Sequence, residues 1–363
     1  MANAPTQRPV VLSDLTADLL WPRLLSVVPL SLGLSRLFAS FVGVVLCAAM
    51  MKIPLSWEEG RSLAELWRAQ PYGRGVKNAE VPFVSELIRT IADPALAGLS
   101  LLREHPWAMA TAIPTLIFAS LFAATVARSA AMSFGKRTPV GFAASFAGAV
   151  RSFPAVVIGV MWPLVVVGVI LLGLSVAGAT LWTWGIGQMV GGVGYGLALL
   201  FSGLAMVLLG AWVVAWPLLV PAAVCEGGAS PSAGDGLDAT QRVLAYVYNA
   251  PLRLLLYASL CIIQVIAAVI VFEVLREATI VFARWSSTMW VQEEAIRQVF
   301  DIEGTFANKA VAFWITMLDV ARAALVFSLV VCGGTATYLL IRRCCDGQDE
   351  SELPGMESAR ADG

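Results

Sequence analysis

Residues 152 to 225 read SFPAVVIGVMWPLVVVGVILLGLSVAGATLWTWGIGQMVGGVGYGLALLFSGLAMVLLGAWVVAWPLLVPAAVC and contain no Asp, Glu, Lys, Arg or His. A helix needs about 20 apolar residues to cross a hydrocarbon core about 30 Å thick, and every backbone amide must be hydrogen-bonded within it. The uncharged stretch is too long for one such helix. We therefore predict two membrane spans, at 153–177 and 196–222, joined by a Gly- and Trp-rich hairpin at 180–196.

The composition of the whole chain agrees with a protein that lies in lipid. Of the 363 residues, 58% are hydrophobic and 13% are charged, whereas a soluble domain carries about 25% charged residues. This excludes a soluble globular protein and makes the lipid bilayer the expected partner of its surface. The net charge of −1 argues against binding to nucleic acid, which depends on clustered Lys and Arg.

Four further apolar runs have the length of a span, at 37–55, 107–126, 252–272 and 323–341. The sequence therefore predicts an all-α protein, a polytopic transmembrane helical bundle of about six spans over residues 37–341. The preceding residues 1–36 are expected to form a cytoplasmic or interfacial N-terminal segment. Its apolar part, 24–36, either lies along the interface as an amphipathic helix or lengthens the first span.

Basic residues predict the orientation of the chain in the membrane. The loop at 127–152 has no acidic residue, and short loops rich in Lys and Arg stay in the cytoplasm. Alternation of the spans then places both termini, including the acidic tail at 342–363, in the cytoplasm. The basic residues of that loop are Arg128, Lys136, Arg137 and Arg151.

Two longer loops, at about 56–104 and 273–310, are expected on the outer side. Both contain acidic as well as basic residues, and both have the pattern of helices. Long loops cross the membrane largely regardless of their charge. These outer loops are candidate surfaces for protein partners.

Asp319 and Arg322 stand three residues apart just before the last span. If the helix enters the membrane at Phe313, the two charges form a buried ion pair, and an ionisable residue in a membrane is a functional hypothesis. If the helix enters at Ala323, both charges lie among headgroups. Asp319 and Arg322 are therefore candidate residues of a polar path.

The loop at 223–251 contains the segment GDGLDATQRVLAYVYNAP. Asp235 or Asp238 is placed to cap a short amphipathic helix, in which Asp238 and Arg242 have the spacing of an i,i+4 pair. We predict an elbow at the membrane surface, with Asp238, Arg242 and Tyr246 as candidate residues for binding a protein partner.

This segment resembles a D-A-x-x-R-x-x-x-Y-V-Y-x-x-P pattern found in uncharacterised multi-pass inner-membrane proteins of planctomycete-type bacteria. A preceding W-P-L-x-x-P-A-x-x-x-E-G run and the ending Y-L-L-x-R-R-x-x-D-G are similar to theirs as well. The resemblance implies a bacterial inner membrane and implies no particular activity. The matching residues are Trp216, Pro217, Glu226, Gly227, Asp238, Ala239, Arg242, Tyr246, Tyr248, Pro251, Tyr338, Arg342, Arg343 and Asp346.

Other motifs have structural interpretations. The pairs Gly187/Gly191 and Gly192/Gly196 have the GxxxG spacing that lets helices approach closely. Prolines inside or near the spans predict kinks: Pro114, Pro163, Pro217 and Pro221.

No HExxH, GxSxG, P-loop or CxxC motif occurs in the sequence. We therefore predict no enzymatic activity, and no catalytic, cofactor-binding or metal-binding residues. Our first hypothesis is a non-enzymatic scaffold or partner-binding membrane protein. The alternative is a transporter or channel with a polar path near Asp319 and Arg322.

Overall fold

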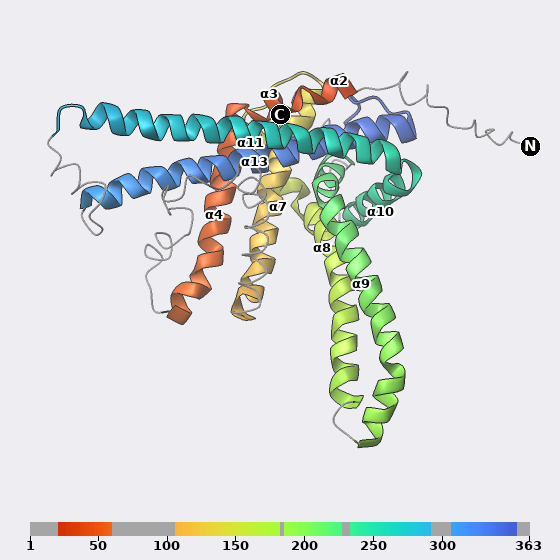
Figure 1. Cartoon of the computed structure of the whole chain (residues 1–363). Helices are drawn as coiled ribbons and strands as arrows, with labels where there is room; N and C mark the ends of the chain where they lie inside the picture. Colours follow the sequence, from red (N-terminus) through yellow and green to blue (C-terminus); the bar gives the residue numbers. More distant parts are fainter. Residues whose placement is uncertain (1–20, 60–105, 182–184, 227–232, 292–305, 354–363) are drawn as a thin grey trace, which may run out of the picture. The chain divides into compact units, whose positions relative to one another are not determined.

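A computed structural model describes residues 21–59, 106–181, 185–226, 233–291 and 306–353 of the chain. These residues are almost entirely helical and contain no strand (Figure 1). The helices are α2 (Trp21–Leu24), α3 (Val27–Ser31), α4 (Leu34–Glu59), α7 (Pro106–Gly135), α8 (Phe142–Leu181), α9 (Gly185–Glu226), α10 (Ala233–Asn249), α11 (Pro251–Thr288) and α13 (Phe306–Asp346).

The predicted fold class is confirmed. Among the described residues, five helices are long and apolar enough to cross a membrane, namely α7, α8, α9, α11 and α13. A sixth span results if the short helices before α4 are counted with α4 as one broken span. The chain is thus an all-α integral membrane protein with about six candidate spans.

Several helices extend well beyond the predicted limits of the spans. Helix α9 has 42 residues and is about 60 Å long at 1.5 Å per residue, about twice the thickness of the hydrocarbon core. Helix α11 continues to Thr288, so the expected outer loop at 273–310 is, where described, mainly the continuation of α11 and α13. Most of the other expected outer loop, residues 60–104, lies outside the described residues.

The predicted extent of the hairpin at 180–196 is wrong. Helix α8 continues to Leu181 and α9 already begins at Gly185, so the glycine-rich segment is helical. Glycine weakens a helix in water by about 1 kcal/mol. Helix α9 packs along α8, and such tertiary packing overrides the weak helix propensity of single residues.

The chain divides into two compact units. Unit 1 comprises residues 1–33, 124–265 and 329–363, and unit 2 comprises residues 34–123 and 266–328. Helices α7, α11 and α13 each contribute to both units.

In unit 1, α8 and α9 run antiparallel and side by side, and α10 packs on both of them (Figure 1). The C-terminal half of α13 forms the core, since every residue from Val331 to Arg342 is buried. In the most apolar window of α13, 83% of the residues are buried, compared with 6% in α9. Helix α9 therefore offers an apolar surface to lipid, whereas α13 is covered by protein.

Prolines in unit 1 free backbone carbonyl groups that lie against neighbouring helices. Pro163 has no N–H, so the Gly159 carbonyl four residues earlier loses its partner within α8. The Thr240 hydroxyl of α10 donates a hydrogen bond to this carbonyl at 3.2 Å. Pro221 in the same way frees the Pro217 carbonyl of α9, and Gly334 of α13 lies directly against it.

Close helix contacts occur at Gly334 and Gly236, which do not belong to the predicted GxxxG pairs. A Cβ atom on Gly334 would overlap the Pro217 carbonyl oxygen, and one on Gly236 of α10 would overlap the Ala155 carbonyl oxygen of α8. In contrast, a Cβ atom on Gly192 or Gly196 would meet nothing within 4 Å. The prediction that Gly192 and Gly196 pack against a neighbouring helix is therefore wrong.

In unit 2, α4 packs against the N-terminal part of α7. Gly43 lies so close to Phe122 that a Cβ atom would come within 2.8 Å of the Phe122 Cβ. The Cys47 thiol donates to the Thr115 carbonyl at 3.7 Å. Residues 24–36 do not lengthen α4 as one continuous helix, because the helical segments break at Leu32 and Gly33.

The contact of Gly334 with the Pro217 carbonyl predicts a difference between two Gly→Ala substitutions in helices. Gly334→Ala should lower the free energy of unfolding by about 1–3 kcal/mol, because the methyl group would force two packed backbones apart. Gly196→Ala should be neutral or stabilise by up to about 1 kcal/mol, because alanine has the higher helix propensity. Thermal unfolding of both variants in detergent, followed by circular dichroism, measures the difference. Equal midpoints would contradict the assigned contact.

Candidate functional site

The most prominent polar group of unit 1 is the carboxylate of Glu226, the last residue of α9. It accepts a hydrogen bond from the Tyr338 hydroxyl at 2.5 Å and lies 3.3 Å from Nε of Arg342. It also accepts a hydrogen bond from Arg242 of α10. These four residues, the Glu226 cluster, tie together the end of α9, the middle of α10 and the C-terminal part of α13.

The burial of these groups differs strongly. The side chains of Glu226 and Arg342 are 11% and 2% exposed, whereas that of Arg242 is 49% exposed. Nε of Arg342 also donates to Oε1 of Gln348 at 2.5 Å, while its Nη1 is buried and has no acceptor among the described residues. A buried charge is costly unless it is paired, so the Glu226–Arg342 pair is the energetic centre of the cluster.

A second link joins α10 to the end of α13. The Tyr246 hydroxyl donates a hydrogen bond to the Asp346 carboxylate, and the rings of Tyr246 and Tyr338 lie 6.2 Å apart. Burial raises the pKa of the Tyr246 phenol, and the hydrogen bond to the negatively charged Asp346 raises this pKa further. Tyr246 therefore stays protonated, as a donor, at neutral pH.

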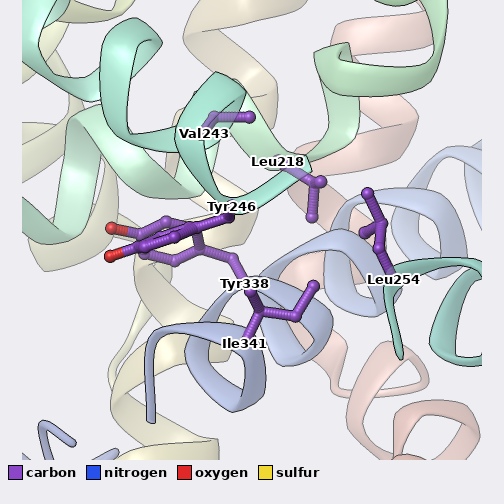
Figure 2. Close-up of a pocket in the computed structure, with 6 residues that line it drawn as sticks. All are labelled: Leu218, Val243, Tyr246, Leu254, Tyr338 and Ile341. Atoms are coloured by element: carbon purple, nitrogen blue, oxygen red, sulfur yellow. The ribbon is translucent and has the colours of Figure 1, made fainter. Parts of the chain in front are cut away.

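An apolar pocket lies beside these two tyrosines (Figure 2). It has no room for a water molecule. The pocket is thus a packing gap between α9, α10, α11 and α13 and not a substrate site. Its lining residues are Leu218, Val243, Tyr246, Leu254, Tyr338 and Ile341.

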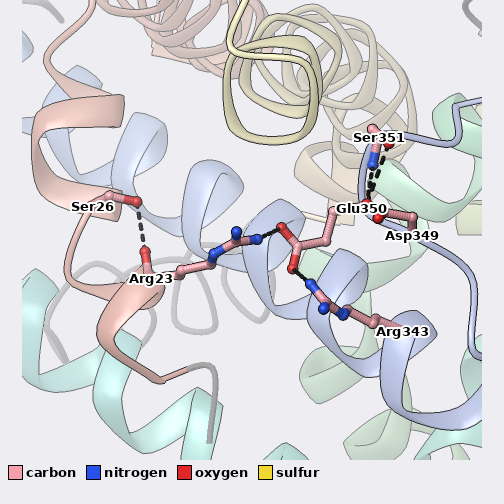
Figure 3. Close-up of polar contacts among 6 residues, drawn as sticks. All are labelled: Arg23, Ser26, Arg343, Asp349, Glu350 and Ser351. Carbon is pink, nitrogen blue, oxygen red and sulfur yellow. Dashed lines mark hydrogen bonds and ion pairs between the residues drawn. The ribbon is translucent and has the colours of Figure 1, made fainter. Parts of the chain in front are cut away.

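The first residues after α13 also pack on unit 1. Glu350 is almost fully buried and pairs with both Arg343, at 3.0 Å, and Arg23 (Figure 3). Leu353 is fully buried, and the backbone oxygen of Glu350 lies against Gly135 at the end of α7. The first part of the predicted acidic tail is thus fixed to the helices by its own acidic residue.

In unit 2, Asp319 and Arg322 do not pair with each other. Asp319 binds Arg276 at 2.9 Å, and Arg322 binds Glu273. Both partners come from α11, which runs antiparallel to α13 at this point. Arg276 also approaches Glu273 at 3.9 Å and binds Glu277. We call these five residues the α11–α13 charge cluster.

Residues 273 and 322 face each other in the α11–α13 charge cluster. The predicted limits of two spans, 272 and 323, therefore lie at the same level along this helix pair. The side chains of Asp319, Arg276 and Arg322 are 12%, 13% and 17% exposed. The charges are thus mostly covered by protein, and each has an oppositely charged partner.

The predicted elbow at 223–251 forms a helix, α10, although its details differ from the prediction. Arg242 and Tyr246 belong to the polar contacts described above, whereas Asp238 is exposed and forms no ion pair with Arg242 in the described part of the chain. Arg242 forms its ion pair with Glu226 instead. Asp235 does not cap the helix but lies in its first turn, where a negative charge favours the helix dipole.

Several residues of the two clusters were missed by the sequence analysis. Glu226, Tyr338 and Arg342 appeared there only as matching residues of the resemblance, with no contact predicted for them. The sequence did contain one signal that Glu226 needs a partner, because it is the first charged residue after the uncharged stretch 152–225. Glu273 and Arg276 were assigned to a loop, so no pairing with Asp319 and Arg322 was expected.

The described residues contain no group of three or more His, Cys, Asp or Glu side chains arranged to hold a metal ion. Chemically, the two clusters provide ion pairs and hydrogen bonds that join helices. Comparison with known proteins finds no matching family model, no similar curated protein and no similar solved structure.

The unequal burial in the Glu226 cluster predicts unequal effects of two substitutions. Glu226→Gln leaves the buried Arg342 guanidinium without a carboxylate, and we expect a loss of about 3 kcal/mol in the free energy of unfolding. Arg242→Gln removes a half-exposed partner and should cost less than about 1 kcal/mol. Thermal unfolding in detergent measures both effects. Similar losses for the two variants would show that Glu226 does not hold Arg342 in place.

Proposed function

We propose that this protein is a non-enzymatic, polytopic protein of a bacterial inner membrane that binds a protein partner in the cytoplasm through α10. The bacterial location rests on the resemblance of the segment from Trp216 to Pro251 to inner-membrane proteins of planctomycete-type bacteria. The orientation rests on the basic residues between α7 and α8, which place this connection and both termini in the cytoplasm.

The observation that carries the proposal is the fixed position of α10. This helix joins two candidate spans, α9 and α11, so it lies on one side of the membrane. Gly236 and Thr240 attach it to α8, Arg242 attaches it to Glu226, and Tyr246 attaches it to Asp346. Such attachments hold the helix rigid, which lowers the entropic cost of binding a partner.

The face of α10 that points away from these contacts is exposed and mixed in character. Tyr248 is 83% exposed and Leu244 is 38% exposed, and Asp238, Gln241 and Ala245 are exposed beside them. Tyrosine supplies a large rigid ring with a polar tip, and it is enriched at the centres of protein interfaces. The expected partner is a protein segment with an apolar patch for Tyr248 and Leu244 and a hydrogen-bond donor or a basic group for Asp238.

Photo-crosslinking in intact membranes tests this proposal. A benzoyl-phenylalanine in place of Tyr248 or Leu244 should give one discrete protein adduct, because both positions face outward on α10. The same probe in place of Tyr195, an exposed tyrosine of α9, is the matched control and should not give that adduct. Glu226→Gln combined with the Tyr248 probe should weaken the adduct, because α10 loses its attachment to α9. Adducts with lipid alone at position 248 would mean that Tyr248 is only a membrane anchor and would refute the proposal.

A second candidate function is transport along a polar path at the α11–α13 charge cluster. The supporting observation is that five charged residues gather on two helices that are each long and apolar enough to cross a membrane. The cluster contains three acidic and two basic residues and so carries an excess negative charge. Such a group suits a pathway for a cation better than one for an anion.

Transport predicts that the cluster controls flux. Asp319→Asn should change the flux of a monovalent cation into proteoliposomes at least several-fold, because it removes a mostly buried partner of Arg276. Lys309→Gln, at an exposed position of the same helix, is the control and should leave the flux unchanged. If the wild-type protein shows no flux, or if Asp319→Asn has the same flux as the wild type, the transport function is ruled out.

A further inference from the structure

Two arginines in unit 1 lie close together without an acidic partner. Arg128 of α7 is within electrostatic reach of Arg151 of α8, and the two charges repel each other. Neither of them forms an ion pair with an acidic residue in the ranges that the structure describes, and no Asp or Glu occurs between residues 127 and 152. The carboxylate of Glu226 already interacts with Arg242, Tyr338 and Arg342.

The absence of a side chain at Gly148 makes room for the side chain of Arg128. The Arg128 guanidinium lies over Gly148 of α8, so close that a Cβ atom on this residue would overlap its Nε and Cζ atoms. Arg151 follows Gly148 by three residues and so lies on the same face of α8. The missing side chain at position 148 thus leaves room for the Arg128 guanidinium against α8, one turn before Arg151, although the two positive charges repel each other.

The pair lies near the ends of two candidate spans. Arg128 is seven residues before Gly135, the last residue of α7, which corresponds to about 10 Å along the helix. Arg151 is nine residues after Phe142, the first residue of α8. Long arginine side chains at this depth reach the headgroup layer while their stems stay in apolar surroundings.

An exposed apolar stripe on α8 begins at Trp162, eleven residues after Arg151 and about 16 Å further along the helix. Residues 162, 165, 169, 172 and 176 follow at spacings of three or four residues after position 158, which places them on the same face of the helix as Arg151. A molecule held at the arginine pair would therefore extend along an apolar surface. The exposed side chains of this stripe are Trp162, Val165, Val169, Leu172 and Val176.

We propose that Arg128 and Arg151 bind the phosphate group of an anionic phospholipid whose acyl chains lie along the α8 stripe. The planar guanidinium group matches phosphate oxygens with two parallel hydrogen bonds, and a phosphate between the two arginines removes their repulsion. Basic pockets between helix ends are known to bind acidic lipid headgroups. The apolar stripe favours a lipid over a soluble anion. This inference does not depend on a partner of α10 or on transport.

The test compares lipids and variants of the full-length chain. Delipidated protein in detergent is mixed with phosphatidylglycerol or phosphatidylcholine, and the bound lipid is counted by native mass spectrometry. The wild type should bind phosphatidylglycerol about tenfold more tightly than phosphatidylcholine. Arg128→Gln and Arg151→Gln should each weaken phosphatidylglycerol binding about tenfold, because a charge-assisted hydrogen bond is lost. Lys309→Gln is the charge-matched control and should bind like the wild type.

A third variant tests the position of Arg128 without changing the charge. Gly148→Ala should displace the guanidinium and weaken phosphatidylglycerol binding several-fold while the net charge stays the same. If Gly148→Ala does not elute as a folded species in gel filtration, the two arginine variants decide the matter. Equal binding of both lipids by the wild type, or unchanged binding by both arginine variants, would refute the proposal. Full displacement of the lipid by millimolar inorganic phosphate would show a site for a free anion and would refute the lipid assignment.

Discussion

A carboxylate at the edge of an apolar helix must find positive charge or hydrogen-bond donors, and unit 1 is organised around this constraint. Glu226 follows a stretch without any charged residue. Its carboxylate accepts a hydrogen bond from Tyr338 and pairs with Arg342 and Arg242, which come from two other helices. The same carboxylate neutralises the charge of Arg342, which is almost fully buried. One acidic residue therefore fixes where α9 ends, how α10 lies and which part of α13 enters the core.

In the apolar part of unit 1 the same requirement applies to backbone carbonyl groups, which need a hydrogen-bond donor. Pro163 and Pro221 each deprive a carbonyl group of its partner within the helix, and in hydrocarbon no water is present to replace it. Thr240 donates a hydrogen bond to one of these carbonyls, and Gly334 allows α13 to approach the other closely. The carbonyl freed by Pro163 therefore becomes an attachment point for α10, and the one freed by Pro221 lies at the closest approach of α13.

The sequence predicted what depends on local composition and missed what depends on contacts between distant residues. The fold class and the apolar spans followed from the absence of charge, as in residues 152–225. The hairpin was placed wrongly because glycine propensity is a weak local signal that the packing of α9 along α8 overrides. The partners of Asp319 and Arg322 could not be predicted, because Glu273 and Arg276 become neighbours only when α11 and α13 lie antiparallel. Arg242 and Asp238 had ideal spacing for a pair, yet the more buried Glu226 has the greater need for a cation.

Two sets of charged residues in the described chain differ in how they are neutralised. Glu226, Glu350 and the acidic residues of the α11–α13 charge cluster pair with arginines from other helices, so these charges join elements of the protein to one another. Arg128 and Arg151 have no such acidic partner in the described ranges. Gly148 leaves room for the Arg128 guanidinium against α8, within electrostatic reach of Arg151. Arg151 is exposed, so a counter-charge from outside the chain can reach the pair. At the end of a membrane span, the most abundant source of that charge is the lipid headgroup.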